Sequence, residues 1–152
     1  MLHTIQTKQF IKSDINTLWE FISSPKNLSK ITPKYMGFNI LSDLGDGKMF
    51  PGQIIEYFVT PIAGIKMNWV TEITHVKDKE YFVDEQRFGP YSMWHHKHFL
   101  KEVSGGVEMI DVVHYKVPFG VFGKLANSLF IKKQLSTIFD FRYKKMEELF
   151  NQ

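Results

Sequence analysis

Residues 92–117 read SMWHHKHFLKEVSGGVEMIDVVHYKV, and the architecture of the chain can be worked out from this segment. Bulky and polar side chains alternate with a period of two on both sides of Gly105-Gly106, which is typical of two antiparallel strands joined by a tight turn. Successive strand residues point to opposite sides of a sheet, so the alternation also assigns faces. Lys97 and Lys101 mark the solvent face of the first strand. The segment therefore predicts two neighbouring strands with one face toward a core.

The same alternation continues toward the N-terminus. Short links rich in glycine, proline or aspartate separate the runs, and links this short suit antiparallel neighbours because parallel pairing needs long crossovers. The sequence thus predicts one antiparallel sheet of about seven strands. The predicted strands are residues 4–11, 36–41, 53–60, 65–76, 81–88, 92–103 and 107–117.

Helical patterns flank these strands. Ser13-Asp14 offers N-cap side chains for a helix that ends at Ser24-Pro25, residues 27–31 predict a short helical turn, and residues 121–150 predict a long helical pattern. The predicted order is β-α-α-β-β-β-β-β-β-α, an α+β fold. A sheet this wide must curl, and we expect it to wrap around the long C-terminal helix. A curled sheet around one helix leaves space between them, so a cavity is predicted.

Composition limits the function classes. The 152 residues suit a single domain over residues 1–152, and the lack of cysteine excludes disulfides and Cys-ligated zinc. A net charge of +3 is too weak to indicate nucleic-acid binding. No stretch has the apolar length of a signal peptide or a membrane span, and we expect a cytoplasmic protein. Aromatic residues make up 15% of the chain, a high share that needs a location.

Aromatic and polar side chains share the predicted inner face. On residues 81–88 the opposite assignment, with Tyr81 and Val83 inward, suits a core equally well. The inward sets are Ile55, Tyr57 and Val59; Ile65, Met67, Trp69, Thr71 and Ile73; Phe82, Asp84, Gln86 and Phe88; Trp94, His96, His98 and Leu100; and Val107, Met109, Asp111, Val113, Tyr115 and Val117.

Buried carboxylates need partners, and the inward histidines are the obvious ones for Asp84 and Asp111. A neighbouring carboxylate is expected to raise a histidine pKa above ~6.5. Three interpretations stay open: a satisfied buried network, a set of hydrogen-bonding groups for a ligand, or an acid–base site whose catalytic candidates are His96, His98, Asp111 and Asp84. We expect no metal, because adjacent histidines on a strand point apart and only His96 and His98 share a face. No cofactor is expected.

The C-terminal helical pattern carries two apolar stripes, with Lys132-Lys133 where one gives way to the other. A straight helix cannot bury both stripes against one sheet, so we expect a bend near Lys132 or a first stripe that faces something else. Residues 119–130 would then form a flap over the cavity mouth, a dimer contact or a membrane-touching edge; monomer and homodimer both stay open. The first stripe is Phe122, Leu125, Ala126, Leu129 and Phe130, and the second includes Leu135, Ile138, Phe139, Met146 and Leu149.

The element order and four stretches resemble the START-like or SRPBCC superfamily, which includes the Bet v 1 type, and within it a bacterial ligand-binding subgroup. Polyketide cyclases/dehydratases and coenzyme Q-binding START proteins are related to that subgroup. The resemblance covers essentially the whole chain and implies a helix-grip fold with an apolar cavity. The stretches are residues 24–28 (SPKNL) with 31–33 (ITP); 69–73 (WVTEI); 82–91 (FVDEQRFGPY) with 94–98 (WHHKH); and Asp111 and Tyr115 with 118–120 (PFG) and 139–142 (FDFR).

The cavity and the resemblance together predict a carrier or sensor for a hydrophobic molecule, which would be lipid-like, aromatic or polyketide/quinone-like. A first alternative is a cyclase/dehydratase-type enzyme in which His96 or His98 abstracts a proton. A second is a quinone or lipid chaperone that touches a membrane weakly through an entrance or partner surface of Phe119, Phe122, Leu125 and Phe130. The predicted ligand-binding residues are Tyr57, Met67, Trp69, Phe82, Gln86, Trp94, His96, His98, Asp111 and Tyr115.

Overall fold

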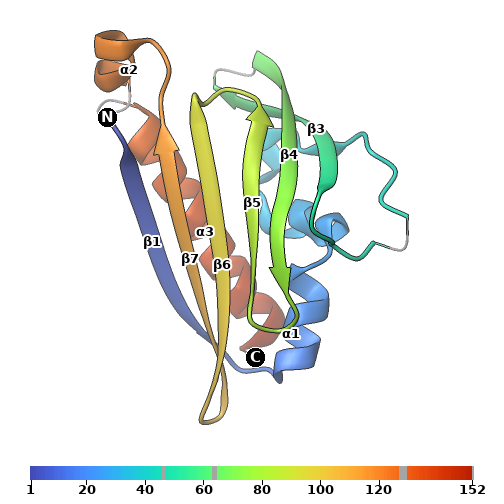
Figure 1. Ribbon diagram of the computed structural model, residues 1–152. Coiled ribbons are helices and arrows are strands. Elements are labelled where there is room, and N and C mark those ends of the chain that lie inside the picture. Colours follow the sequence, from blue (N-terminus) through green and yellow to red (C-terminus); the bar gives the residue numbers. More distant parts are fainter. Residues whose placement is uncertain (46, 63–64, 127–129, 152) are drawn as a thin grey trace.

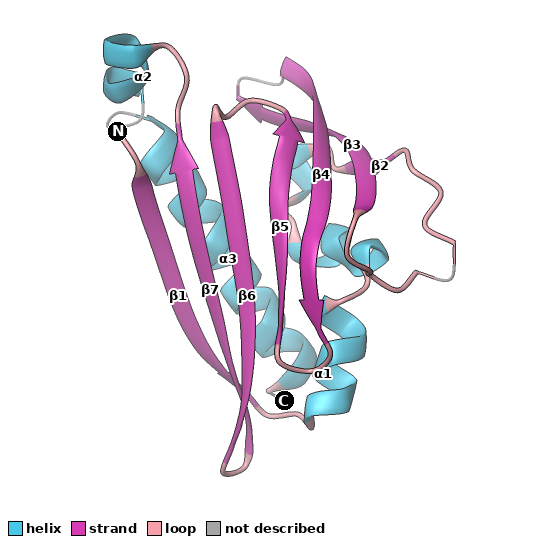
Figure 2. Cartoon of the chain, viewed as in Figure 1, coloured by secondary structure: helices cyan, strands magenta, loops and turns pink. Residues whose placement is uncertain are grey.

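In the computed structural model, residues 1–45, 47–62, 65–126 and 130–151 are described. A seven-stranded sheet carries helices on one of its faces (Figure 1; Figure 2). The elements in chain order are β1 (His3–Ile11), α1 (Ile15–Ile22), the 3-10 turns η1 (Pro25–Ile31) and η2 (Lys34–Met36), β2 (Asn39–Ile40), β3 (Gln53–Ile62), β4 (Ile65–Lys77), β5 (Tyr81–Phe88), β6 (Met93–Val103), β7 (Gly106–Lys116), α2 (Gly120–Ala126) and α3 (Lys132–Phe150).

The strands lie in the order β1-β7-β6-β5-β4-β3-β2, and every neighbouring pair is antiparallel. Each strand from β3 to β7 pairs with the next along the chain, as short links require. The first strand pairs with the last, so His3 lies opposite Tyr115. Helix α3 runs along the inner face of this sheet (Figure 1). The predicted α+β fold, with a curled sheet around the C-terminal helix, is confirmed.

Helix α1 begins where the sequence predicts. The Asp14 carboxylate accepts hydrogen bonds from the backbone N–H groups of Asn16 and Thr17, at 2.9 and 3.0 Å, and so caps the helix. The helix ends before Ser23, next to Pro25. Its buried side chains, Leu18 among them, pack with Ile11, Val107 and Met146 to close one end of the space between sheet and α3.

Two further apolar clusters surround the middle of that space. Leu135 and Phe139 of α3 pack against Val113 and Tyr115 of β7. Beneath η2 a third cluster includes Ile55 and Tyr57 of β3 with Trp69 and Ile73 of β4. The region between these clusters is where the pocket lies.

Two side chains expected to point inward are exposed. Ile65 is 61% exposed and Phe88 is 64% exposed, so these two assignments are wrong. Ile65 is the first residue of β4, and Phe88 lies beyond the part of β5 that pairs with β6, whose last pair is Glu85 with His95. Val83 is buried alongside Phe82, so both assignments considered for residues 81–88 are right in part. Register shifts between β4 and β5 accompany this mixed pattern.

Two elements differ from the prediction. Strand 36–41 shrinks to Asn39–Ile40, because Met36 ends η2 and Gly37 takes a left-handed backbone conformation with φ +54°. The helical pattern over 121–150 contains two helices, α2 and α3. The bend expected near Lys132 stays a prediction, because Ile131 directly before α3 keeps a helical backbone (φ −65°, ψ −45°) and part of the link to α2 lies outside the described residues. The first apolar stripe does not face the sheet: Phe122 is 82% exposed. Residues 127–129, with Leu129 of that stripe, lie outside the described residues.

Candidate functional site

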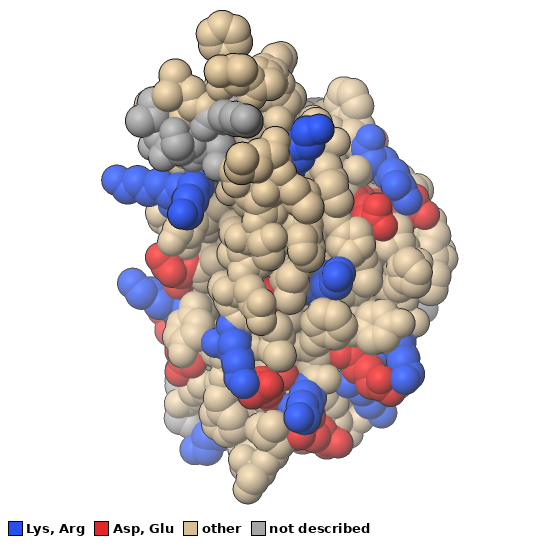
Figure 3. All heavy atoms as spheres, turned by 60° about the vertical axis from the view of Figure 1, so that its left-hand side comes forward, with Lys and Arg blue, Asp and Glu red and all other residues tan. Residues whose placement is uncertain are grey.

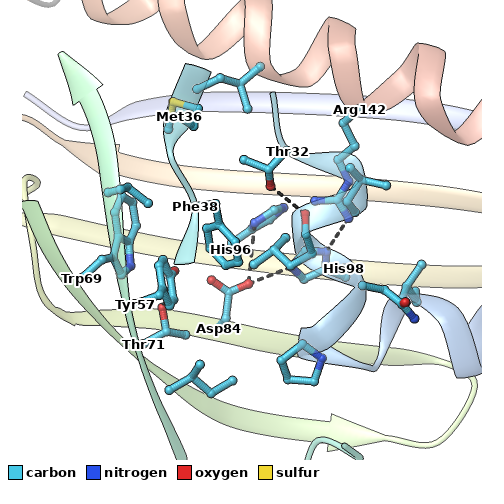
Figure 4. A pocket seen from close by; sticks show the side chains of 18 of the residues that line it. Thr32, Met36, Phe38, Tyr57, Trp69, Thr71, Asp84, His96, His98 and Arg142 are labelled. Carbon is cyan, nitrogen blue, oxygen red and sulfur yellow. Dashed lines mark hydrogen bonds and ion pairs between the residues drawn. The ribbon is translucent and has the colours of Figure 1, made fainter. Parts of the chain in front are cut away.

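A pocket of about 170 Å³ lies between the inner face of the sheet, the first half of α3 and the segment from η1 to β2. Its walls are mainly apolar, and its charged groups, Asp84, His98 and Arg142, lie close together (Figure 4). Side chains that line it include Leu28, Ile31, Thr32, Met36, Phe38, Ile40, Met49, Ile55, Tyr57, Val59, Trp69, Thr71, Ile73, Phe82, Asp84, Tyr91, Trp94, His96, His98, Gln134, Leu135, Ile138, Phe139 and Arg142.

Strand register assembles the polar side of the pocket. Asp84 of β5 lies opposite His96 of β6, and His98 of β6 lies opposite Asp111 of β7. All four share the inner face, because opposed residues of paired strands point to the same side. Arg142 reaches this group from α3, where it follows Phe139 by one helical turn. These five residues are called the polar cluster below.

Two carboxylates hold two imidazole rings in the polar cluster. Asp111 Oδ1 lies 3.1 Å from His96 Nε2 and 2.8 Å from His98 Nδ1. Asp84 Oδ2 lies 2.7 Å from His98 Nε2 and 3.6 Å from His96 Nδ1 (Figure 4). Arg142 Nη2 lies 3.5 Å from Asp111 Oδ1 and so places a second positive charge beside that carboxylate.

Both carboxylates are ionised. Burial favours the neutral form of Asp111, but the Arg142 charge and the hydrogen bonds from His96 and His98 outweigh it and hold the pKa of Asp111 well below its usual range. Burial is likewise outweighed at Asp84, whose pKa is lowered by the hydrogen bond and charge of His98 and by the charge of Arg142. Each facing imidazole nitrogen within hydrogen-bond distance therefore carries a proton.

The two histidines differ in charge. Burial opposes a charge on His98, yet hydrogen bonds to Asp111 and Asp84 on its two nitrogens raise its pKa, so the ring is an imidazolium. Its ring stacks on Phe82 with centroids 4.0 Å apart, a contact that favours a positive ring. Burial and the neighbouring His98 charge lower the pKa of His96, which is neutral. The expected rise in histidine pKa is confirmed for His98 and wrong for His96.

The polar cluster is balanced in charge. Two carboxylates, Asp84 and Asp111, face two cations, His98 and Arg142, while His96 stays neutral. His96 donates from Nε2 to Asp111, so its Nδ1 keeps a lone pair on the side of Asp84, and both residues line the pocket. The wall thus offers a bound molecule an acceptor nitrogen and a carboxylate close together.

Two N–H donors of the pocket lining lack a partner among the described residues. Trp69 Nε1 and Arg142 Nε are buried without a hydrogen bond, and Trp69 and Arg142 are 8% and 9% exposed. Burying a donor without a partner is costly. A ligand with acceptor oxygens would satisfy both groups.

Asp84, His96 and His98 have ligand-type atoms within 4.8 Å of one another, a spacing that could hold a metal ion. A cation would have to replace the proton that His98 Nε2 shares with Asp84 at 2.7 Å. The Arg142 guanidinium, 3.4 Å from His98 Nδ1, adds repulsion. The electrostatics of the polar cluster therefore favour protons over a metal.

The structure brings most of the predicted site residues together. Tyr57, Trp69, Phe82, Trp94, His96 and His98 line the pocket, as does the candidate Asp84. Asp111 and Tyr115 are buried behind the lining, and Met67 packs at the edge of the β3–β4 cluster. Gln86 bonds through its amide to the backbone of Tyr91 and not to the polar cluster.

The sequence analysis did not identify one wall of the pocket or the positive charge of Arg142. The wall is the segment from η1 to β2, whose irregular backbone carries no alternation to assign faces. The charge is Arg142, which lies on the buried stripe of α3 with Leu135, Phe139 and Met146. Its position, seven residues after Leu135, fits the helical period and could have placed it inward.

The predicted entrance or partner surface lies outside the pocket, at the end of the sheet where β7 leads into α2 (Figure 1). Phe119, Phe122, Leu125 and Phe130 are all exposed, by 80%, 82%, 59% and 70%. None of the helices within the described residues combines the length and apolar character needed to cross a membrane.

Comparisons with known proteins show the fold. No family model matches the sequence, and no curated protein matches it either. Solved structures do match: protein CV1439 from Chromobacterium violaceum has a TM-score of 0.73 at 14% identity, with 98% of each chain covered. A START superfamily protein from Mycobacterium smegmatis has a TM-score of 0.71 at 14% identity, covering 97% of this chain and 99% of that one. Ara h 8.0201 gives 0.64 at 14% identity, with coverage of 97% and 99%. The chain has the START-like helix-grip fold.

Proposed function

We propose that this protein binds a small hydrophobic molecule, as a carrier or sensor, in the pocket between the sheet and α3. The observation that carries the proposal is an apolar pocket whose charged groups are gathered on one wall. Such a pocket gives a ligand affinity through apolar burial and gives it orientation through the polar wall. Deep pockets of this kind also fit the START-like fold of the chain.

The size of the pocket favours a ring system over a long acyl chain. Its volume of about 170 Å³ is close to the ~150 Å³ of a dry cavity that accepts benzene. Aromatic side chains of Tyr57, Trp69, Phe82 and Trp94 supply flat surfaces for stacking. We therefore infer a ligand whose enclosed part is one or two rings.

The unpartnered donors set the polar chemistry of the ligand. Trp69 Nε1 and Arg142 Nε would each donate to an oxygen of the bound molecule. His96 Nδ1 would accept from a hydroxyl. A ring compound with carbonyl and hydroxyl oxygens meets both requirements, which agrees with the aromatic or polyketide/quinone-like class.

Native mass spectrometry of gently purified protein tests whether an apolar molecule co-purifies, and titration with 2-naphthol, read by tryptophan fluorescence, measures binding. Ile55→Phe fills the pocket from β3, whereas Ile54→Phe makes the same change on the exposed side of that strand. We expect I55F to weaken 2-naphthol binding about tenfold or more and I54F to leave it unchanged.

Ile138→Phe repeats the test from α3 if I55F does not fold. Equal 2-naphthol affinity in wild type, I55F and I138F, with no co-purified molecule, would rule out the proposed pocket function.

Acid–base catalysis on the bound molecule is a second candidate function. It is favoured by the opposite pKa shifts of His96 and His98, since paired groups pushed apart can divide the roles of base and acid. His96 would abstract a proton from an acidic C–H, and the unpartnered Nε–H of Arg142 would donate a hydrogen bond to the enolate oxygen.

Deuterium uptake from solvent at the acidic carbon of benzoylacetone, followed by NMR, tests the second candidate. His96→Gln should abolish any acceleration by the protein, and His95→Gln, on the outer face of β6, should keep it. Acceleration that survives in H96Q would exclude His96 as the base.

A further inference from the structure

Five exposed apolar side chains gather at one end of the molecule. They flank or belong to α2 and are Phe119, Val121, Phe122, Leu125 and Phe130, exposed by 80%, 78%, 82%, 59% and 70%. We call this surface the apolar tip. Figure 3 shows it as a tan projection beyond the rest of the molecule. Exposing a group of apolar side chains to water is energetically unfavourable, so a surface like this indicates a binding partner.

The backbone holds the apolar tip away from the sheet. Phe119 has φ +69° and Gly120 has φ +52°, so the chain turns through two left-handed residues directly after β7. A left-handed conformation is unfavourable for phenylalanine, and strained residues of this kind concentrate at functional surfaces.

The charge around the apolar tip is of one sign. Between Asp111 and Asp140 the sequence contains no acidic residue and four lysines. Lys116, Lys132 and Lys133 are exposed at the ends of β7 and α3 that adjoin α2. Figure 3 shows basic side chains, in blue, near the base of the projection and no acidic side chain on the face of the projection in view.

An anionic bilayer fits both features. Phenyl and aliphatic groups enter the boundary between headgroups and acyl chains, while lysines around them bind lipid phosphates. A second copy of the chain fits less well, because a two-fold contact would bring the lysines of both copies together. Five side chains also cover less than the ~800 Å² per partner of a stable dimer.

We propose that the apolar tip docks this protein onto anionic lipid surfaces. The inference goes beyond ligand binding, and it has a consequence for the pocket. Gln134, which lines the pocket, follows Phe130 by four residues, about 6 Å along a helix. Docking through the tip would therefore place one end of the pocket lining close to the bilayer.

Co-sedimentation with vesicles tests the docking. Wild type should bind vesicles of phosphatidylcholine with phosphatidylglycerol, bind phosphatidylcholine alone more weakly, and lose binding as salt rises. Phe122→Asp should weaken binding about tenfold or more. The matched control, Phe88→Asp, places the same charge on another exposed phenylalanine, 64% exposed on β5, and should bind like wild type.

A charge pair tests the lysines. Lys132→Glu with Lys133→Glu should abolish the preference for anionic vesicles, whereas Lys12→Glu with Lys101→Glu, at the opposite end of the sheet, should keep it. The proposal is overturned if wild type binds neither kind of vesicle. It is also overturned if F88D loses vesicle binding as F122D does. A wild-type dimer in light scattering that becomes a monomer in F122D, together with no vesicle binding, also overturns the proposal. I55F should still bind vesicles, so failure of the pocket and failure of the tip can be told apart.

Discussion

Asp111 is the residue on which the polar cluster depends. One carboxylate oxygen, Oδ1, lies within 3.5 Å of His96, His98 and Arg142, and the side chain is buried. Removing its charge would leave two buried cations, the Arg142 guanidinium and the His98 imidazolium, beside a single carboxylate, Asp84.

We expect Asp111→Asn to lower the free energy of unfolding by about 3 kcal/mol, since one partner of a buried charge pair is lost. Urea unfolding monitored by tryptophan fluorescence measures the change. Asp140→Asn is the matched control, because Asp140 lies exposed on α3. A loss in D140N equal to that in D111N would contradict a special role for the buried carboxylate.

His98 makes stability depend on pH. Its pKa is raised by folding, so its contribution is complete below the unfolded value of about 6.5 and is lost as pH rises through the folded pKa. We expect the free energy of unfolding to fall as pH rises above about 6.5, by no more than about 1.4 kcal/mol per pH unit for one proton. Urea unfolding at a series of pH values measures this slope.

His98→Asn should remove this dependence of the free energy of unfolding on pH, and His95→Asn on the outer face of β6 should keep it. An unchanged dependence in H98N would show that another group causes it. His96 acts in the opposite direction, because its lowered pKa means that its contribution is lost as pH falls below about 6.5. The contribution of Asp111 is present above about 3.8 and is lost only as pH falls further.

At the scale of elements, the turn between β6 and β7 is tightly fitted against β1. Gly105 takes φ +82°, and a Cβ there would meet only Phe10 Cζ at an ordinary 4.0 Å, whereas a Cβ on Gly106 would lie 2.3 Å from the carbonyl oxygen of Ile11. We expect Gly106→Ala to destabilise the protein by about 2–3 kcal/mol, because backbone must move to relieve the overlap. The smaller cost expected for Gly105→Ala, about 1 kcal/mol, comes from its left-handed backbone alone.

Chemical unfolding of G106A and G105A side by side measures the difference. Equal losses in the two variants would show that backbone conformation, and not the close approach to Ile11, limits both positions.

Elements with a regular period could be predicted from sequence. Strands β3 to β7 and the inner-face positions of His96, His98 and Asp111 follow from alternation, whereas alternation left the face of Asp84 on β5 open. Prediction failed in segments without a regular alternation of side chains, and where a strand extends beyond the part that pairs with its neighbour. Phe88 is exposed because β6 does not extend alongside it, and pairing lengths depend on tertiary structure.

The candidate site was predictable to the same extent. Its histidine and carboxylate side came from strand parity, whereas the wall from η1 to β2 came from irregular backbone. The pKa directions could not be predicted, because His96 and His98 differ only in how the two carboxylates approach their nitrogens. That difference is under 1 Å, 3.6 against 2.7 Å for Asp84 Oδ2, and no spacing in the sequence encodes it.

At the scale of the whole molecule, the first strand holds the last helix. Gln9 of β1 is buried, and its amide nitrogen donates to the Tyr143 carbonyl at 2.9 Å and to Glu147 Oε1 at 2.8 Å. The Asn151 side chain adds hydrogen bonds to the backbone of Phe10 and Lys12. These contacts join opposite ends of the chain and keep α3 against the sheet.

Gln9→Ala should therefore loosen the C-terminal half of α3. We expect a loss of about 1–2 kcal/mol in the free energy of unfolding, from buried hydrogen bonds and side-chain volume. Amide hydrogen exchange should become faster in residues 143–150 than elsewhere. Gln6→Ala, at an exposed position of the same strand, should change neither; equal exchange in both variants would contradict the link.

The pocket has two walls of different construction. Long paired strands and α3 hold the charged wall, whereas the opposite wall comes from η1, η2 and a strand of two residues. Substitutions at Met36, Phe38 or Ile40 can therefore reshape the pocket without disturbing the ionic contacts. The molecule is thus suited to redesign: randomising these three positions would diversify which ring compounds are accepted, on a scaffold whose polar anchor stays fixed.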